Sequence, residues 1–253
     1  MNAVREVEVA GKGRALVAAK DLRRGDVAFR DRAIAMGYSD VDLLATCVAK
    51  GSTDVRRCID EELCSLSLAD LSEEAKGRIF AMVDAAKAHL EFFAPFAESS
   101  DDSDDADASD ASTCDDVMLR AALKLECNVF TLWTAKYEPR AICLFRLACR
   151  LNHSCSPNLV REQDGDEITF TALADIAAGD ELTFTYVPAS WSRAERQKLL
   201  RDYFQFECGC ARCAGDPEDD ARACGVLGHV GCGGSWNASG ACAICGARRA
   251  PGE

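Results

Sequence analysis

The residues best suited to chemistry lie in one short stretch, Asn152-His153-Ser154-Cys155-Ser156-Pro157-Asn158. It combines two amides, an imidazole, hydroxyls and a thiol within seven residues. Pro157 prevents the stretch from continuing as a helix or as a central strand, and a mostly apolar run at residues 141–148 precedes it. Because a polar, irregular segment that follows a buried run commonly contacts a ligand, we expect a binding or catalytic site here.

Three interpretations of this stretch stay open from its own residues. His153 and Cys155 could form an imidazole–thiolate pair for nucleophilic catalysis, since residues i and i+2 share one face of an extended chain. Alternatively, Cys155 is a metal ligand, and Asn152 and His153 bind a ligand through main-chain and side-chain contacts. The third interpretation is a turn rich in Asn, Ser and Pro, with a buried cysteine and a satisfied histidine.

Two groups of cysteines downstream favour metal binding. Cys208, Cys210 and Cys213 have C-x-C-x-x-C spacing, which supplies three of the four ligands of a tetrahedral zinc site, and Cys155 is the expected fourth. If Cys155 binds zinc, it is not available as the nucleophile of a hydrolase. A second structural zinc is predicted at the remaining thiols, with His229 as an alternative ligand: Cys224, Cys232, Cys242 and Cys245.

Composition narrows the class of protein and its compartment. The chain has 253 residues, 15 cysteines and a net charge of -13, and nine acidic residues without Lys or Arg lie at residues 98–116. The negative charge is therefore mainly local, and no direct nucleic-acid binding is expected. Residues 1–13 lack the apolar region of a signal peptide, and no apolar run reaches the roughly 18 residues of a membrane span. We expect a monomer without membrane contact in a reducing compartment, the nucleus and/or the cytoplasm.

Hydrophobic periodicity predicts many short strands around a helical segment. Strands are expected at residues 4–9, 14–19, 27–29, 159–161, 168–172 and 182–186, and helices at 79–93, 115–125 and 193–203. Asp164-Gly165 predicts a hairpin turn. Capping boxes are expected at Ser192 with Glu195 and, as a variant, at Asp70 with Glu73. The acidic residues 98–116 are predicted to form a disordered surface loop.

A short pattern occurs twice in the sequence, at residues 21–26 and at residues 175–180. Both copies read Asp-(Leu or Ile)-x-x-Gly-Asp and precede an expected strand. Gly25 and Gly179 are therefore predicted to adopt positive φ in matching turns.

Taken together, these motifs resemble a SET-domain protein lysine methyltransferase of the SMYD-like type. The similar segments are residues 9–29 with a Gly-x-Gly turn, 127–132, 152–158, 179–186 and 206–213. The segment 127–132 is similar to the family's helix that lends an Asn to the cofactor, so a helix is expected there as well. Residues 33–113 lack the paired cysteines of a MYND finger, so a SMYD-like chain without this finger and without the C-terminal helical domain is expected. The resemblance divides the chain into an N-terminal SET segment (1–36), a helical insert (37–132), a C-terminal SET core (133–207) and a post-SET zinc-binding tail (208–253).

The resemblance implies an α+β, β-rich, β-clip-like SET fold in which the Asn152 segment threads a loop formed by the Tyr186 segment, as a pseudoknot. It implies a protein substrate that presents a lysine, and Tyr186 as the catalytic residue that orients the lysine amine. The alternative is a catalytically silent, zinc-stapled SET module that binds proteins. S-adenosylmethionine is the implied cofactor, and its implied ligands are Gly11, Lys12, Gly13, Asn128, Asn152, His153, Tyr186 and Phe206.

Overall fold

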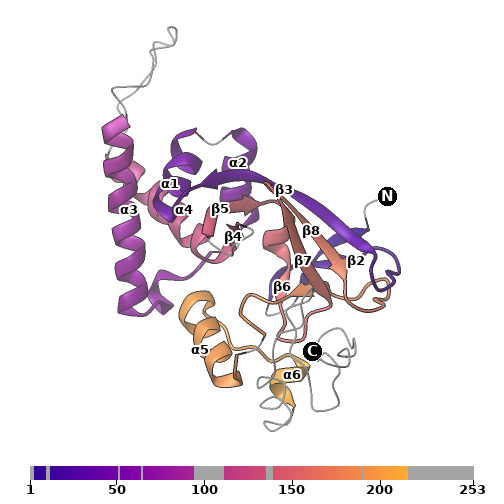
Figure 1. Cartoon of the computed structure of the whole chain (residues 1–253). Helices are drawn as coiled ribbons and strands as arrows, with labels where there is room; N and C mark the ends of the chain where they lie inside the picture. Colours follow the sequence, from indigo (N-terminus) through magenta and orange to yellow (C-terminus); the bar gives the residue numbers. More distant parts are fainter. Residues whose placement is uncertain are drawn as a thin grey trace. The chain divides into compact units, whose positions relative to one another are not determined.

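The computed structural model describes residues 3–9, 12–50, 52–63, 65–93, 111–134, 139–189 and 191–215. These residues fall into two compact units (Figure 1). Unit 1 takes its residues from 1–32 and 150–253, and unit 2 takes its residues from 33–149. Among the helices that the structure describes, none is both long enough and apolar enough to cross a bilayer.

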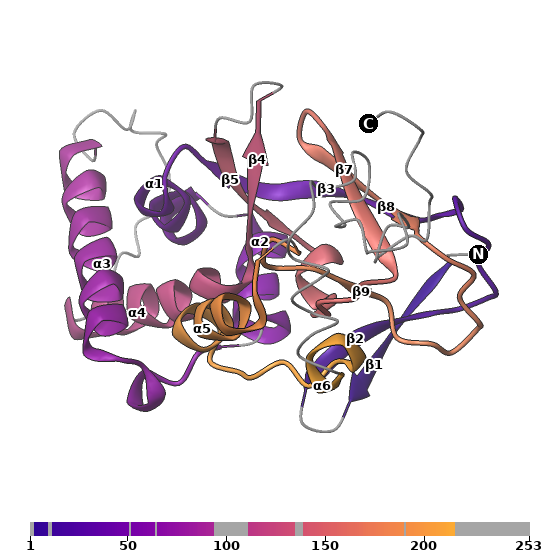
Figure 2. The ribbon, with the colours of Figure 1, turned by 60° about the horizontal axis from the view of Figure 1, so that its bottom comes forward.

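Unit 1 is built mainly from strands (Figure 2). Its elements are β1 (Val4–Val9), β2 (Gly13–Ala18), the first half of β3 (Val27–Gly37), β6 (Asn152–His153), β7 (Leu159–Asp164), β8 (Glu167–Ala172), β9 (Thr183–Phe184), α5 (Arg193–Phe204) and α6 (Ala211–Ala214). β1 and β2 form one antiparallel hairpin, β7 and β8 form another, and β3 pairs antiparallel with β8. The predicted strands at both hairpins are confirmed.

The β7–β8 turn lies one residue further along than the sequence predicts. Asp164 is paired with Glu167, so the two turn residues are Gly165 and Asp166, and Gly165 has φ of 61°. Positive φ costs glycine little, and this explains why the turn is centred on that residue.

At α5 the predicted capping box is confirmed, because the Ser192 hydroxyl accepts from the Glu195 backbone N–H and the Glu195 carboxylate accepts from the Ser192 N–H.

The two copies of the Asp-(Leu or Ile)-x-x-Gly-Asp pattern pair with each other. Leu22 and Ile176 exchange backbone hydrogen bonds of 2.9 and 2.8 Å. The aspartates that begin the two patterns, Asp21 and Asp175, each accept from a backbone N–H of the other copy. Gly25 and Gly179 have φ of 90° and 93°, so the predicted matching turns are confirmed. This reciprocal pairing ties the end of β2 to the chain that leads into β9.

The central motif is held by a short parallel pair of strands. Asn152 and His153 of β6 lie opposite Thr183 and Phe184 of β9. The two segments expected to form the pseudoknot are thus side by side. The strand predicted at residues 182–186 is shorter than expected, because the Tyr186 backbone N–H donates to the His153 ring and not to a neighbouring strand.

Unit 2 is mainly helical and carries a continuous apolar core. Its helices are α1 (Asp40–Ala45), α2 (Thr53–Arg57), α3 (Glu73–Phe93) and α4 (Ala111–Asn128), with π-helical η1 (Thr46–Lys50) and η2 (Cys58–Glu62) and 3-10 helix η3 (Leu68–Asp70). Its strands β4 (Val129–Trp133) and β5 (Pro139–Phe145) pair antiparallel, and the second half of β3 pairs with β5. The core includes Leu44, Ile79, Ala86, Met118 and Leu144. The chain passes from unit 2 to unit 1 within η5 (Ala148–Arg150).

Three details of unit 2 differ from the sequence predictions. The capping box at Asp70 and Glu73 is wrong: Asp70 ends η3, and the Ser72 hydroxyl accepts from the Ala75 N–H at 3.2 Å. The α4 helix begins at Ala111, inside the segment predicted to be a loop, and ends at Asn128. Residues 129–133 form β4, since their β-branched and aromatic side chains favour a strand, so the helix expected over 127–132 stops at Asn128. Residues 98–110 of the acidic tract lie outside the described residues.

Candidate active site and metal centre

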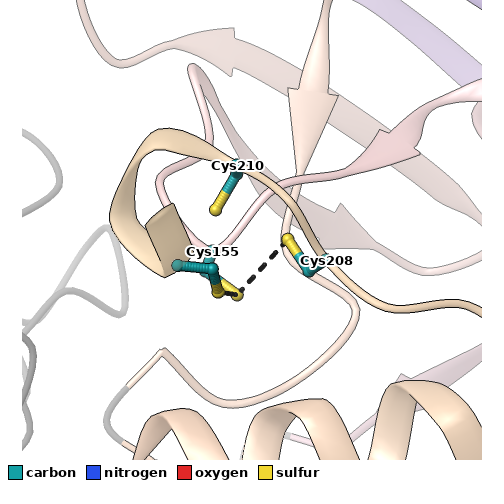
Figure 3. A group of neighbouring side chains, drawn as sticks. Cys155, Cys208 and Cys210 are labelled. Carbon is teal, nitrogen blue, oxygen red and sulfur yellow. Dashed lines mark hydrogen bonds between the residues drawn. The ribbon is translucent and has the colours of Figure 1, made fainter. Parts of the chain in front are cut away.

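Four cysteine side chains of unit 1 converge. The sulfur atoms of Cys155, Cys208, Cys210 and Cys213 all lie within 4.8 Å of one another. Figure 3 shows Cys155, Cys208 and Cys210 close together. The Cys155 sulfur is 3.9 Å from that of Cys208 and 3.5 Å from that of Cys213. A tetrahedral site with Zn–S bonds of about 2.3 Å places its sulfurs roughly 3.8 Å apart. The four thiols therefore have the donor type and spacing that a tetrahedral zinc ion requires.

The protonation of these thiols is coupled. Hydrogen bonding with Cys208 and Cys210 raises the pKa of the Cys155 thiol, and burial raises it further. Hydrogen bonds with Cys155 and Cys208 lower the pKa of the Cys210 thiol. One thiolate is thus stabilised by protonated neighbours, because four negative charges this close repel strongly. A divalent cation removes this restriction, and its binding would release the remaining protons.

A buried arginine faces the same sulfurs. Arg196 on α5 is fully buried, and its Nε donates to the Cys155 sulfur at 3.1 Å. Its Nη2 donates to Cys213 at 3.8 Å and its Nη1 donates to the Trp191 carbonyl at 2.5 Å. A guanidinium stays protonated, and a buried charge needs a counter-charge, which the thiolates supply. Arg196 was not predicted from the sequence; the available signal was its i,i+4 spacing to the apolar Leu200 on the expected helix.

His153 connects this group to the backbone of Tyr186. Its Nε2 lies 3.1 Å from the Cys155 sulfur, and its Nδ1 accepts the Tyr186 backbone N–H at 3.0 Å. Burial lowers the pKa of His153 to about 4, the nearby Arg196 charge lowers it as well, and Cys210 opposes both. The imidazole is therefore neutral at physiological pH. Cys155 contacts three sulfurs and a guanidinium. It is therefore not available as the nucleophile of a catalytic Cys–His pair.

The Tyr186 side chain lies among aromatic rings and has an oriented hydroxyl. Its hydroxyl donates to the Leu151 carbonyl at 2.5 Å, and its ring centroid is 4.9 Å from that of Phe204. Phe206 meets the Tyr186 ring edge-on at a centroid distance of 6.4 Å. The hydroxyl proton is directed at the Leu151 carbonyl, and this bond fixes the orientation of the hydroxyl group.

A second network joins the expected cofactor turn to the central motif. Glu181 accepts from the Lys12 ammonium at 2.7 Å through Oε2 and from the Asn152 side-chain amide at 2.8 Å through Oε1. The Asn158 amide donates to the Glu181 carbonyl at 2.8 Å, and its Oδ1 accepts the Thr183 N–H at 2.8 Å. Glu181 and Asn158 were not predicted as site residues, although both lie inside the motifs at residues 152–158 and 179–186.

The structure brings together part of the predicted site. His153, Tyr186 and Phe206 belong to the first of these two networks in unit 1, and Lys12 and Asn152 belong to the second. Gly13 begins β2 with φ of 73°. Asn128 belongs to unit 2, where its amide donates to the Lys124 carbonyl at 2.7 Å. Gly11 lies outside the described residues, as does the complete second cysteine set at residues 224–245.

With this geometry established, comparison with known proteins decides the family. A family model of the SET domain matches residues 13–187, which is more than half of the chain. The chain belongs to the SET-domain family. The SET fold expected from the resemblance is thereby confirmed as a mixed fold of helices and strands, in which three cysteines near the C-terminal end cluster with Cys155.

Relatives of this SET protein include SMYD-type methyltransferases. It is 36% identical over 102 residues to mouse "Histone-lysine N-methyltransferase SMYD3", an alignment that covers 40% of this chain and 24% of the relative. It is also 36% identical over 98 residues to "Histone-lysine N-methyltransferase ASHR1" of Arabidopsis thaliana, covering 38% of this chain and 20% of the relative. The alignments thus span about a quarter or less of these relatives.

One solved structure with a similar chain is the SET domain of LSMT bound to lysine and AdoHcy. Its TM-score is 0.47 and its sequence identity is 16%, with 82% of this chain and 53% of that chain covered.

Proposed function

We propose that this SET protein is an S-adenosylmethionine-dependent methyltransferase that transfers a methyl group to the side-chain amine of a lysine in a protein substrate. One observation supports the proposal most: Tyr186 lies at the end of the β9 segment, with its hydroxyl fixed on Leu151, the residue directly before Asn152. Membership in the SET family and similarity to lysine methyltransferases agree with this reading.

Tyr186 would orient the arriving amine. The proton of its hydroxyl group is directed at Leu151. The hydroxyl oxygen would accept a hydrogen bond from the lysine nitrogen and a C–H···O contact from the methyl group of the sulfonium. Alignment of nucleophile, methyl carbon and leaving sulfur converts the reaction into an effectively unimolecular displacement. The bound cofactor would supply the methyl group and leave as a neutral thioether.

The aromatic side chains around Tyr186 would favour the reactive form of lysine. A free lysine has a pKa of about 10.4 and cannot attack while it is protonated. Phe184, Phe204 and Phe206 all contact the Tyr186 ring, and an apolar surround lowers the pKa of an amine by desolvation. The same rings would exclude water from the reacting atoms.

Cofactor binding would involve the Lys12–Glu181–Asn152 network. Glu181 holds the Asn152 amide group, so the Asn152 side chain has a fixed direction. Both ring nitrogens of His153 are occupied within the protein, so a cofactor contact from His153 would come from its main chain. Gly11, Gly13, Asn128 and Phe206 complete the proposed cofactor set.

The four thiols Cys155, Cys208, Cys210 and Cys213 would hold a structural zinc ion, and residues Cys224, Cys232, Cys242 and Cys245 would hold a second. The first zinc would tie the central motif to the segment after α5. We further propose a monomer in the nucleus and/or cytoplasm, where clustered thiols stay reduced.

The proposal is tested by titrating the purified chain with S-adenosylmethionine and then incubating it with labelled cofactor and a cell lysate. Mass spectrometry of the labelled proteins should locate the methyl group on lysine side chains. Cofactor binding without any transfer would favour the silent, zinc-stapled binding module. Absence of cofactor binding by a zinc-loaded, folded chain would contradict the proposal.

A further inference from the structure

His153 has two ring nitrogens that face two different partners. Nδ1 accepts the Tyr186 backbone N–H at 3.0 Å, and Nε2 lies 3.1 Å from the Cys155 sulfur. A backbone N–H can only donate, so Nδ1 carries no proton and the single ring proton is on Nε2. The geometry therefore defines the tautomer, and Nε2–H donates to the sulfur.

A second N–H group, from Arg196, also donates to the Cys155 sulfur. Arg196 Nε is also 3.1 Å from this sulfur, so two N–H groups converge on it. Hydrogen bonds to an ionised acceptor are shorter and stronger than those to a neutral one, so both donors would bind this sulfur more strongly once Cys155 holds a metal as a thiolate. Groups that bond a metal ligand from outside its coordination shell orient that ligand and tune its basicity.

The His153 side chain is also largely shielded from water. His153 is 8% exposed, and its ring centroid is 5.2 Å from that of Tyr186 and 6.0 Å from that of Phe206. In such surroundings water cannot replace a lost partner, so each hydrogen bond of the ring is costly to break.

We propose that His153 is a positioning residue that couples the four-cysteine centre to the catalytic tyrosine. A metal held by Cys155 fixes the sulfur, the sulfur fixes the imidazole, and the imidazole fixes the backbone N–H of Tyr186. The proposal rests on the proposed function for the catalytic role of Tyr186, whereas the hydrogen-bonded chain itself can be observed without any turnover.

The chain of contacts is tested by NMR on the full-length protein, labelled with ¹⁵N and loaded with ¹¹³Cd in place of zinc. His153 Nε2–H is expected to show a scalar coupling to the cadmium nucleus through its N–H···S bond, and Nδ1 is expected to be unprotonated. Arg196 Nε–H donates to the same sulfur and is the internal positive control. A His153 protonated on Nδ1, or a cadmium coupling at Arg196 without one at His153, would overturn the proposal.

Two variants test the two hydrogen bonds of the His153 ring separately. These two bonds, to the Cys155 sulfur and to the Tyr186 backbone N–H, are the two halves of a relay. His153→Asn places an amide oxygen near the Nδ1 position, and His153→Gln places an amide nitrogen near the Nε2 position. The Tyr186 amide resonance should stay close to its wild-type position in His153→Asn and move in His153→Gln. In both variants, one half of the relay is broken, so single-turnover methylation should fall about tenfold, the effect of a barrier change of about 1.4 kcal/mol.

Cofactor affinity distinguishes positioning from direct binding. Both variants should bind S-adenosylmethionine within about twofold of wild type, because the imidazole has no free nitrogen for the cofactor. Weaker cofactor binding with an unchanged rate of the bound complex would overturn the proposal and place the side chain in the cofactor site. If the wild-type chain transfers no methyl group, the proposed function fails, while the cadmium coupling and the Tyr186 resonance still decide whether the relay exists.

Discussion

The helices of unit 2 bury one continuous group of aliphatic side chains, whereas the residues around Asn152 in unit 1 are joined mainly through polar groups and sulfurs. Ile79, Ala86, Met118 and Leu144 illustrate the first kind of contact. The hydrogen bonds from Tyr186 to His153 and from Asn152 to Glu181 illustrate the second.

This difference predicts how each unit responds to substitution. Apolar packing is not directional, so its loss changes stability in proportion to the volume removed. A hydrogen bond or a metal ligand fixes the direction of single atoms, so its loss changes geometry one partner at a time. Substitutions in unit 2 should therefore act on stability, and substitutions around Asn152 should act on metal content, cofactor affinity or rate.

The largest effect is expected from Cys155→Ser. This variant loses one ligand of the proposed zinc site, and structural zinc contributes about 10–16 kcal/mol in small zinc modules at neutral pH. Elemental analysis should show one zinc per chain in place of two, and thermal unfolding should occur at a clearly lower temperature.

Cys242→Ser is the matched control for Cys155→Ser. It should also release one zinc, from the second proposed site, but leave S-adenosylmethionine affinity largely intact. Two zinc ions in the Cys155→Ser variant would contradict the assignment of Cys155.

In unit 2, Ile79→Ala should lower the free energy of unfolding by about 2–5 kcal/mol, because Ile79 is fully buried in the helical core. Its zinc content should equal that of wild type. Phe80→Ala is the control on the same helix: Phe80 is 44% exposed, and its truncation should change stability by no more than about 0.5 kcal/mol. Denaturant unfolding measures both, and loss of zinc from Ile79→Ala would remove the contrast between the two units.

A smaller effect is expected from Glu181→Gln. The amide oxygen of Gln can still accept from Asn152, but the ion pair with Lys12 is lost. Because Lys12 is 51% exposed, the pair contributes at most about 1 kcal/mol, and S-adenosylmethionine affinity should fall about two- to fivefold. Glu167→Gln breaks a comparably exposed pair with Arg30 and should leave this affinity unchanged in the same calorimetric titration. Equal effects of both variants on cofactor affinity would show that Glu181 has no specific role in the cofactor site.

The smallest effect is expected from deletion of residues 99–110, which stops before α4 begins at Ala111. Acidic residues without counter-charges repel each other and bury little apolar surface. The melting temperature of the shortened chain should stay within about one degree of wild type. A large decrease would indicate that this tract binds a basic surface of the same chain.

Local signals predicted most of the fold. Gly25, Gly179 and Gly165 marked turns through their backbone freedom, and Ser192 with Glu195 marked the start of α5. At α3 the same reasoning chose Asp70 and missed Ser72, two residues later, because several residues near the helix start can cap it. Such errors are shifts along the chain and leave the topology unchanged.

Within the site, only those contacts were predicted whose partners both belong to recognisable sequence motifs. Cys155 was paired with the C-x-C-x-x-C segment because three thiols lacked a fourth ligand. The bridging role of His153, the Leu151 carbonyl and the buried Arg196 depend on which atoms meet in three dimensions. Residue type and spacing do not contain that information, so these contacts required the structure.

Tyr186 is the central residue of the proposed active site. Single-turnover methylation by Tyr186→Phe, measured beside cofactor titration, tests it most directly. The phenyl ring keeps the aromatic contacts, so S-adenosylmethionine affinity should stay nearly unchanged. Loss of one oriented polar group should slow methyl transfer by roughly 10²–10³-fold, or about 2.7–4 kcal/mol. Transfer at the wild-type rate would show that Tyr186 is a core residue and would contradict the proposed active site.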